Sequence, residues 1–196
     1  DLLKRQGYWT ACGAAFEYAL AADPRGERGQ RAAHSAVTCR QQAWTKQQQT
    51  LDKLPKERRM ELVLQHTNDW KGLLRAQQRY LCMARDQPPS DDYADAAFAR
   101  ASAFHSGGSL WEAAIAFRAV AYDYRQLRVG ISAAEQYASV MEPLALDDNC
   151  RLELARDVDH LVGMYCQDSR PTPPQSLLGP QQCQSMRSVA KRLYGY

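Results

Sequence analysis

The chain has 196 residues, 45% of them hydrophobic and 24% charged, which is the composition of an ordinary globular protein and excludes a disordered or collagen-like chain. Its 25 Lys and Arg residues against 22 Asp and Glu residues give a net charge of +3, too small for a dedicated nucleic-acid-binding surface. The longest apolar stretches, such as residues 113–117, fall far short of the ~18 residues that cross a bilayer. We therefore expect one sizeable domain or two small ones, with no membrane span.

The opening residues Asp-Leu-Leu-Lys are typical of a helix interior and do not begin a secretion signal, which has a basic segment followed by an apolar one. We therefore expect the chain to be a fragment of a longer protein. Ala, Leu, Gln, Arg and Glu, the best helix formers, dominate, while β-branched residues are scattered. This composition predicts an all-α fold.

Proline and glycine divide the chain into nine predicted helices, because both residues end a helix at a steric or entropic cost. The breaks fall at Pro24 and Gly26, Pro88 and Pro89, Gly107 and Gly108, Pro143, and residues 171–180. The predicted helices cover residues 1–6, 8–22, 29–48, 56–85, 93–105, 110–124, 129–141, 149–166 and 181–194. The fourth has a candidate break near His66.

Two segments share one spacing pattern, in which a glycine is followed at fixed steps by an apolar, a small, an aromatic and another small or apolar residue. The members are Gly7, Trp9, Cys12, Phe16 and Ala19 in the first segment, and Gly108, Leu110, Ala113, Phe117 and Val120 in the second. Upstream of the second glycine stand Ala101 and Phe104, and the same small and aromatic pair recurs 33 residues later as Ala134 and Tyr137. Such regularity predicts a helical repeat.

The pattern resembles the tetratricopeptide repeat (TPR), a helix-turn-helix unit of about 34 residues that ends near a proline such as Pro24. Small residues such as Ala101 and Ala113 let two helices approach closely, and large rings such as Phe104 and Phe117 fill the space between them. The resemblance implies a right-handed α-solenoid of TPR-like repeats.

The resemblance covers residues 1–145 unevenly. A partial repeat (1–24), a degenerate repeat with an insertion at 45–65 (27–86), a repeat (94–127) and a half repeat (128–145) are expected in that order. Residues 146–196 depart from the pattern and carry two cysteines, so we expect a helical hairpin that caps the C-terminal end.

Residues 79–141 also resemble, more loosely, periplasmic TPR proteins of Gram-negative cell-envelope machinery. This resemblance implies a periplasmic or outer-membrane-associated protein with a role in motility or secretion assembly. Free cysteines would instead indicate the cytoplasm.

Six cysteines are compatible with up to three disulfides and an oxidising compartment. They form no CxxC pair of the kind found in zinc and redox sites, so no metal site is expected. Cys166 and Cys183 flank a proline-rich turn between two predicted antiparallel helices, which predicts a disulfide between them. A bridge from Cys39 to Cys82 is a second expectation, because both lie in paired helices of the degenerate repeat. Cys12 is expected to be a buried apolar residue.

The strong enzyme motifs are missing from the sequence, which holds no phosphate-binding glycine loop, HExxH or GxSxG. We predict no catalytic residue and no cofactor. Asp157, Asp159 and His160 do not all share one face of a helix, as metal ligands would, so a solvated surface is expected there. Arg118 is expected on the convex side of the solenoid.

The resemblance also implies a binding groove. If Ala101 and Phe104 lie in the core, other residues of that helix lie on the stripe that lines the concave groove in this family. The predicted partner-binding residues, including those at the same offsets on the next helix, are Asp95, Phe98, Ser102, His105, Arg128, Ile131 and Glu135. Phe98 is predicted to be the apolar anchor, with Arg128 and Glu135 as orienting contacts. The alternative is that a neighbouring helix covers Phe98, so that its ring is not available to a partner.

The function predicted from these features is a non-enzymatic scaffold that binds a peptide segment or partner subunit in its groove, without nucleic acid. The alternative is a helical enzyme or lipid-binding domain with an internal pocket, which convergent ionisable groups would indicate. A third possibility is a helical element that only stabilises an assembly.

Overall fold

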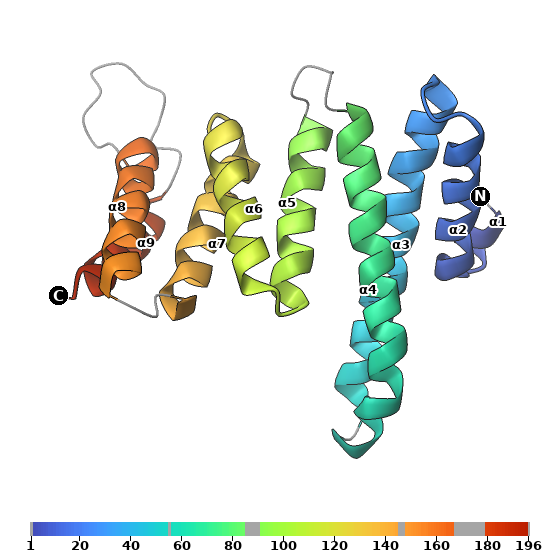
Figure 1. Cartoon of the computed structure of the whole chain (residues 1–196), viewed down its shortest axis with the longest axis horizontal. Coiled ribbons are helices and arrows are strands. Elements are labelled where there is room, and N and C mark those ends of the chain that lie inside the picture. The colour runs from blue at the N-terminus through green and yellow to red at the C-terminus, as the bar shows by residue number, and fades with distance from the viewer. Residues whose placement is uncertain (1, 55, 85–90, 145–147, 167–178, 196) are drawn as a thin grey trace. The chain divides into compact units, whose positions relative to one another are not determined.

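The computed structural model describes residues 2–54, 56–84, 91–144, 148–166 and 179–195, with the backbone alone described at 56–67, 84 and 148–150. All secondary structure in these residues is helical (Figure 1). The helices are α1 (Leu2–Arg5), α2 (Trp9–Ala22), α3 (Glu27–Lys53), α4 (Lys56–Ala84), α5 (Asp91–Ser106), α6 (Leu110–Asp123), α7 (Arg128–Leu144), α8 (Asp148–Tyr165) and α9 (Pro180–Tyr194). The all-α prediction is confirmed.

Helices α3 and α4 form a hairpin whose far end projects past the end of α2 in Figure 1. The far end of the hairpin, where α3 ends at Lys53 and α4 begins at Lys56, falls within residues 45–65. The candidate break near His66 is absent, because α4 runs without interruption from Lys56 to Ala84. No proline or glycine lies between residues 56 and 71 to interrupt its backbone hydrogen bonds. Likewise α7 ends at Leu144, beyond the predicted end at Met141, with Pro143 in its last turn.

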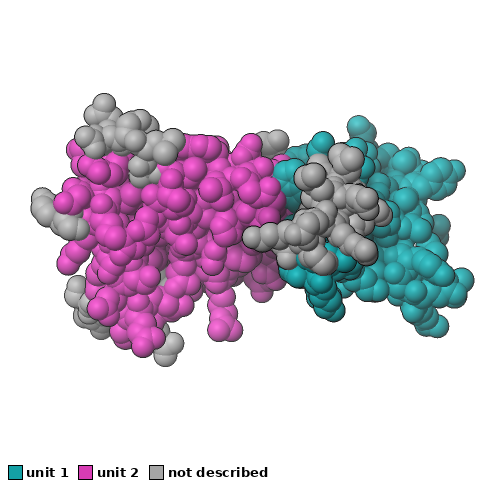
Figure 2. All heavy atoms as spheres, turned by 90° about the horizontal axis from the view of Figure 1, so that it is seen from below, with its two compact units in different colours: residues 1–88 teal, residues 89–196 magenta. Residues whose placement is uncertain are grey.

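The chain divides into two compact units, residues 1–88 and residues 89–196 (Figure 2). In the first unit α2 packs against α1 and α3, and α3 against α4. In the second unit α6 packs against α5 and α7, α7 also contacts α5, α8 and α9, and α8 packs against α9. The hairpin predicted as a separate cap at residues 146–196 therefore shares a unit with residues 89–145.

The second unit has a continuous hydrophobic core drawn from α5 to α9. Small residues from three successive helices, Ala101, Ala113 and Ala134, are completely buried in it. Phe117 and Tyr137 fill the space beside them, with 1% and 3% of their surface exposed. These are the positions to which the spacing pattern assigns the core.

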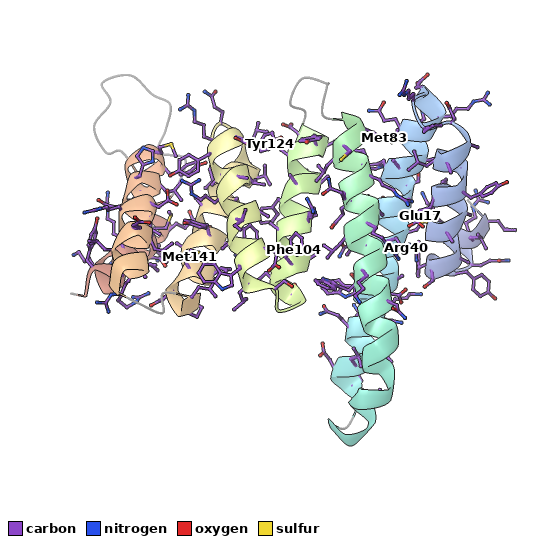
Figure 3. The ribbon with its side chains drawn as sticks, viewed as in Figure 1. Glu17, Arg40, Met83, Phe104, Tyr124 and Met141 are labelled. Carbon is purple, nitrogen blue, oxygen red and sulfur yellow. A yellow bond between two sulfur atoms is a disulfide. The ribbon has the colours of Figure 1, made fainter. Side chains whose placement is uncertain are left out.

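In the first unit a charged pair lies between α2 and α3 (Figure 3). Arg40 of α3 donates from Nε and from a terminal guanidinium nitrogen to the two carboxylate oxygens of Glu17, both at 3.0 Å. Gly13 of α2 leaves room for this arginine, because a Cβ at that position would lie 2.8 Å from the arginine Nε. The pair joins two helices in bidentate geometry while remaining mostly buried.

Two helical segments in the chain have the same local geometry at a separation of 101 residues. The bounds of α2 and α6 differ by this shift, and so do the first residues of α3 and α7. The four residues of α1 correspond in the same way to the last four of α5. We call residues 2–39 and 103–140 the paired segments.

The turns of the paired segments also agree. Gly7 and Gly108 both have a positive φ, +74° and +79°, which favours glycine because it carries no Cβ. After each glycine the next backbone N–H donates to the carbonyl five residues earlier, from Tyr8 to Leu3 at 3.0 Å and from Ser109 to Phe104 at 2.9 Å. This hydrogen bond is that of a Schellman helix end.

The second turn of each paired segment depends on a further glycine. A Cβ at Gly29 would overlap the carbonyl oxygen of Asp23, and a Cβ at Gly130 would overlap that of Tyr124. Both glycines are buried in the first turn of their helices, α3 and α7. The paired segments therefore share the length of their central helix, α2 or α6, both turns and the glycines that those turns require.

Candidate functional site

On α5 the predicted partner-binding residues differ in exposure. Asp95 and His105 are exposed, and Ser102 is half-buried. Phe98 is half-buried too, and its ring lies 5.4 Å from that of Phe117 on α6. Phe98 is thus partly covered by the neighbouring helix, which is the alternative that the sequence left open.

On α7 the three predicted residues also differ. Arg128 is exposed and Ile131 is buried, with 9% of its surface accessible. Glu135 is half-buried; burial raises the pKa of its carboxyl, while a hydrogen bond with Gln182 of α9 acts in the opposite direction. Helices α5 and α7, which carry all the predicted partner-binding residues, contact each other.

A polar cluster of four side chains surrounds the carboxylate of Asp157 on α8, counting His160 at its edge. Arg118 of α6 donates from Nε to Oδ2 at 2.7 Å and from a terminal nitrogen to Oδ1 at 3.0 Å. The Tyr122 hydroxyl donates to Oδ1 at 2.8 Å, and the Tyr137 hydroxyl of α7 donates to Oδ2 at 2.7 Å. One carboxylate therefore joins α6, α7 and α8.

These contacts set the ionisation of the cluster. Burial alone would raise the pKa of Asp157, but hydrogen bonds from Arg118, Tyr137 and Tyr122, with the charge of the guanidinium, lower it overall. Burial, followed by the hydrogen bond to Asp157, raises the pKa of Tyr122 to about 12, and the same two causes raise that of Tyr137. At neutral pH the carboxylate is charged and both phenols keep their protons.

His160 extends the cluster to the surface. Its ring stacks on Tyr122, with ring centres 5.8 Å apart, and its Nδ1 lies 3.0 Å from the tyrosine hydroxyl. Because Asp157 can only accept, the tyrosine uses its single proton on the carboxylate and accepts a hydrogen bond from His160 Nδ1–H. In the neutral ring, Nε2 then carries the lone pair.

A hollow of about 380 Å³ lies over this cluster and opens to solvent. It is lined by residues of α6 and α8, namely Arg118, Tyr122, Glu153, Arg156, Asp157 and His160. Its two arginines and two carboxylates balance in charge. Asp157 is a poor general base, because its lowered pKa weakens its affinity for a proton and both its oxygens already accept hydrogen bonds. The arrangement fits a polar junction between helices.

Sequence reasoning missed this cluster, since it placed Arg118 on a free convex surface and Asp157 and His160 on a solvated one. His160 is exposed as expected but contacts Tyr122, while Asp157 is mostly buried. The available signal was a pair of matching polar stripes, Arg118 and Tyr122 four residues apart and Asp157 and His160 three apart. Within the described residues, no three histidine, cysteine or acidic side chains gather as metal ligands.

Two pairs of cysteines lie at disulfide distance. Cys166 and Cys183 have Cα atoms 5.7 Å apart, so the predicted pairing is confirmed. The predicted bridge from Cys39 to Cys82 is wrong, because Cys39 faces Cys12 on the antiparallel helix α2 and pairs with it, also at a Cα separation of 5.7 Å. Cys82 is exposed, and its Sγ accepts a hydrogen bond from Gln78 at 3.0 Å. Cys12 is buried as expected, but as half of a bridge.

The two cysteine pairs indicate an oxidising environment outside the cytoplasm. None of the helices in the described ranges has the length and apolar character needed to cross a membrane. No protein-family model matches the sequence, and no curated protein matches it either.

Proposed function

We propose that this chain is a non-enzymatic interaction scaffold made of TPR-like repeats, and that it binds a segment of a partner protein on the face shared by α5 and α7. The observation that supports this best is the recurrence of one helix-turn-helix geometry in the paired segments. Their separation of 101 residues is close to three units of about 34 residues. Stacked repeats of this kind present extended surfaces to partner segments.

The binding face proposed on α5 and α7 combines exposed charges with a partly accessible ring. Asp95 and Arg128 are exposed, one on each helix, and a part of Phe98 on α5 remains accessible. Such a face suits a segment that carries charged side chains of both signs and one apolar side chain. Charged contacts at its rim would act mainly on the association rate and its salt dependence.

The paired cysteines and the looser sequence resemblance support a place in the bacterial cell envelope, with motility or secretion assemblies as candidate settings. The competing function, an enzyme or lipid-binding domain with an internal pocket, has less support. The hollow between α6 and α8 is open to solvent, and its buried carboxylate is fully occupied by donors of the chain itself.

Titration of a partner tests the proposal. The partner is isolated from envelope extract with the whole chain, and its binding segment is then titrated against Asp95→Lys and Arg128→Glu. The matched control is Glu112→Lys, an exposed charge reversal on α6, outside the proposed face. Because the reversed charges lie at the rim, we expect each face variant to slow association about tenfold at low salt and much less at high salt, and the control to change the association rate less than about twofold. Weaker binding by the control alone would place the functional surface elsewhere.

A further inference from the structure

The exposed side of α6 carries Trp111, Ile115 and Ala119, which lie four residues apart and therefore follow one line along the helix. Trp111 is 49% exposed and Ile115 is 69% exposed. Their counterparts on α2, 101 residues earlier, are Thr10 and Ala14. Because α2 has the same length as α6 with these smaller residues, the fold does not require large apolar side chains at positions 111 and 115.

Helix α8 lies beside this side of α6 and runs parallel to it (Figure 1). Arg118 contacts Asp157 and Tyr122 contacts His160, so the residue numbers advance in the same direction along both helices. Ile115 lies three residues before Arg118, which puts it level with position 154 of α8, three residues before Asp157.

Two charges stand on α8 on either side of that level. Glu153 and Arg156 are both exposed, line the hollow between α6 and α8, and lie three residues apart on one side of the helix. Arg118 and Asp157 neutralise each other in the same hollow. Glu153 and Arg156 have no ion-pair partner among the described residues, so both are available to a partner chain.

We infer that this face of α6 and α8 joins two copies of the chain in a symmetric dimer. In a two-fold interface, each contact between a residue of one copy and a residue of the other occurs twice. An axis that crosses both helices at the level of Ile115 packs each helix antiparallel to its own copy. Ile115 then packs on the partner's Ile115, and Trp111 covers the partner's Ala119. Glu153 faces the partner's Arg156, and the reverse pair forms across the axis.

The face selects a second copy because it is complementary to itself on both helices about one axis. On α6 the antiparallel order sets the large Trp111 against the small Ala119 at each end, with Ile115 in the middle. On α8 the same axis sets unlike charges opposite each other, as specific association requires. The inference is independent of the proposed function, which concerns α5 and α7.

Sedimentation velocity of the full chain over about 2 to 200 µM tests the dimer, since its population depends on protein concentration. We expect a monomer–dimer equilibrium that Ile115→Asp abolishes, because two like charges then meet at the axis. Glu153→Arg and Arg156→Glu should each raise the dimer dissociation constant at least about tenfold, because each reversal creates two like-charge contacts. The double variant should return to within about threefold of the wild type, because each charge again faces its opposite.

The matched control is Lys191→Glu, an exposed charge reversal on α9, which should change the dissociation constant less than about twofold. All the substituted side chains are exposed, so circular dichroism should show the same helical spectrum for every variant. A chain that stays monomeric throughout the range, a dimer that survives Ile115→Asp, or a double variant that dimerises no better than the single variants would overturn the inference.

Discussion

The carboxylate of Asp157 accepts four hydrogen bonds from three side chains on two other helices. Removing this acceptor is costly, because the remaining donors then lose a charged hydrogen-bond partner in a mostly buried place. Arg118 is half-exposed and can turn to solvent, whereas the Tyr137 hydroxyl lies on a buried residue. The strongest effect is therefore expected when the acceptor itself is removed.

Asp157→Ala should lower the free energy of unfolding by about 2 to 3 kcal/mol, because charged hydrogen bonds contribute about 1.5 to 3 kcal/mol and leave unsatisfied donors when lost. Asp159→Ala, an exposed carboxylate two residues away, is the control and should stay within about 0.5 kcal/mol. Urea unfolding followed by circular dichroism measures both. Equal losses would mean that Asp157 lies on a solvated surface, as the sequence alone suggested.

The pH dependence of stability gives an independent check on Asp157. Its pKa in the folded protein lies below the ordinary value of 3.8, so its stabilising effect is complete above that value and is lost as the pH falls through the folded pKa. The stability difference between the wild type and Asp157→Asn should therefore be largest at neutral pH and shrink in acid. Glu142, whose pKa is lowered by its hydrogen bond with Arg192, titrates in both proteins and cancels. A difference independent of pH would contradict this assignment.

The chemistry around Asp157 could not be predicted from the sequence for a physical reason. Its donors lie 39, 35 and 20 residues away, so their meeting depends on how α6, α7 and α8 are rotated about their axes. A repeat pattern fixes which residues enter the core but gives no rotation accurate enough to align four polar atoms. The predicted pairing of Cys39 was wrong for a similar reason. Both α2, which carries Cys12, and α4, which carries Cys82, pack against α3, and spacing alone does not show which of the two cysteines Cys39 faces.

At the scale of helices, the sequence predicted most of the structure. Gly7 and Gly108 end helices in a left-handed turn that only glycine adopts readily, so helix boundaries near them follow from residue identity. The spacing also placed Phe117 and Tyr137 in the core correctly. The departures are an α4 that runs unbroken past His66, where no proline or glycine lies between residues 56 and 71, and an α7 that includes Pro143 in its last turn.

The paired segments allow the same substitution to be compared at two equivalent positions. Phe117→Ala should cost about 3 to 5 kcal/mol of unfolding free energy, because it removes a fully buried ring and leaves a cavity. Phe16→Ala, the same change 101 residues earlier, should cost clearly less, because that ring is half-buried. His160→Ala should cost at most about 1 kcal/mol, as its ring is exposed. A larger loss from Phe16→Ala than from Phe117→Ala would refute the correspondence.

The same correspondence predicts how the first disulfide can be replaced. Cys12 and Cys39 occupy the places of Ala113 and Val140, both buried in the second unit. The double change Cys12→Ala with Cys39→Val should therefore keep the helical spectrum, although loss of the bridge removes up to about 3.5 kcal/mol in the loop-entropy model. An unfolded double variant would show that the bridge cannot be replaced by packing.

Peptide mapping without reductant tests the pairing itself. We expect one cross-linked fragment containing Cys12 and Cys39, another containing Cys166 and Cys183, and alkylation of exposed Cys82 before any reductant is added. The Cys166 bridge closes a separation of 17 residues and should stabilise by ~3 kcal/mol in the same model. Recovery of free thiols at all four paired positions, from protein prepared under oxidising conditions, would remove the argument for an oxidising compartment.

At the scale of the whole molecule, the chain consists of two compact units, each with its own buried residues and its own cysteine pair. The core cluster of the second unit draws all of its members from residues 101–193. A unit that buries its apolar surface within itself does not need its neighbour in order to fold. Repeat proteins gain stability in the same local way, from contacts between successive helices.

Residues 89–196 expressed alone should consequently fold, with a helical spectrum, a cooperative thermal transition and the bridge between Cys166 and Cys183. The control is the same fragment with Phe117→Ala, which removes the centre of this core and should lower the melting temperature by more than about 10 °C, given ~3 kcal/mol or more and a shift of 4–8 °C per kcal/mol for a domain of this size. Calorimetry and circular dichroism measure both proteins. A fragment that melts without cooperativity, and is indistinguishable from its Phe117→Ala variant, would show that the core of residues 101–193 requires the first unit.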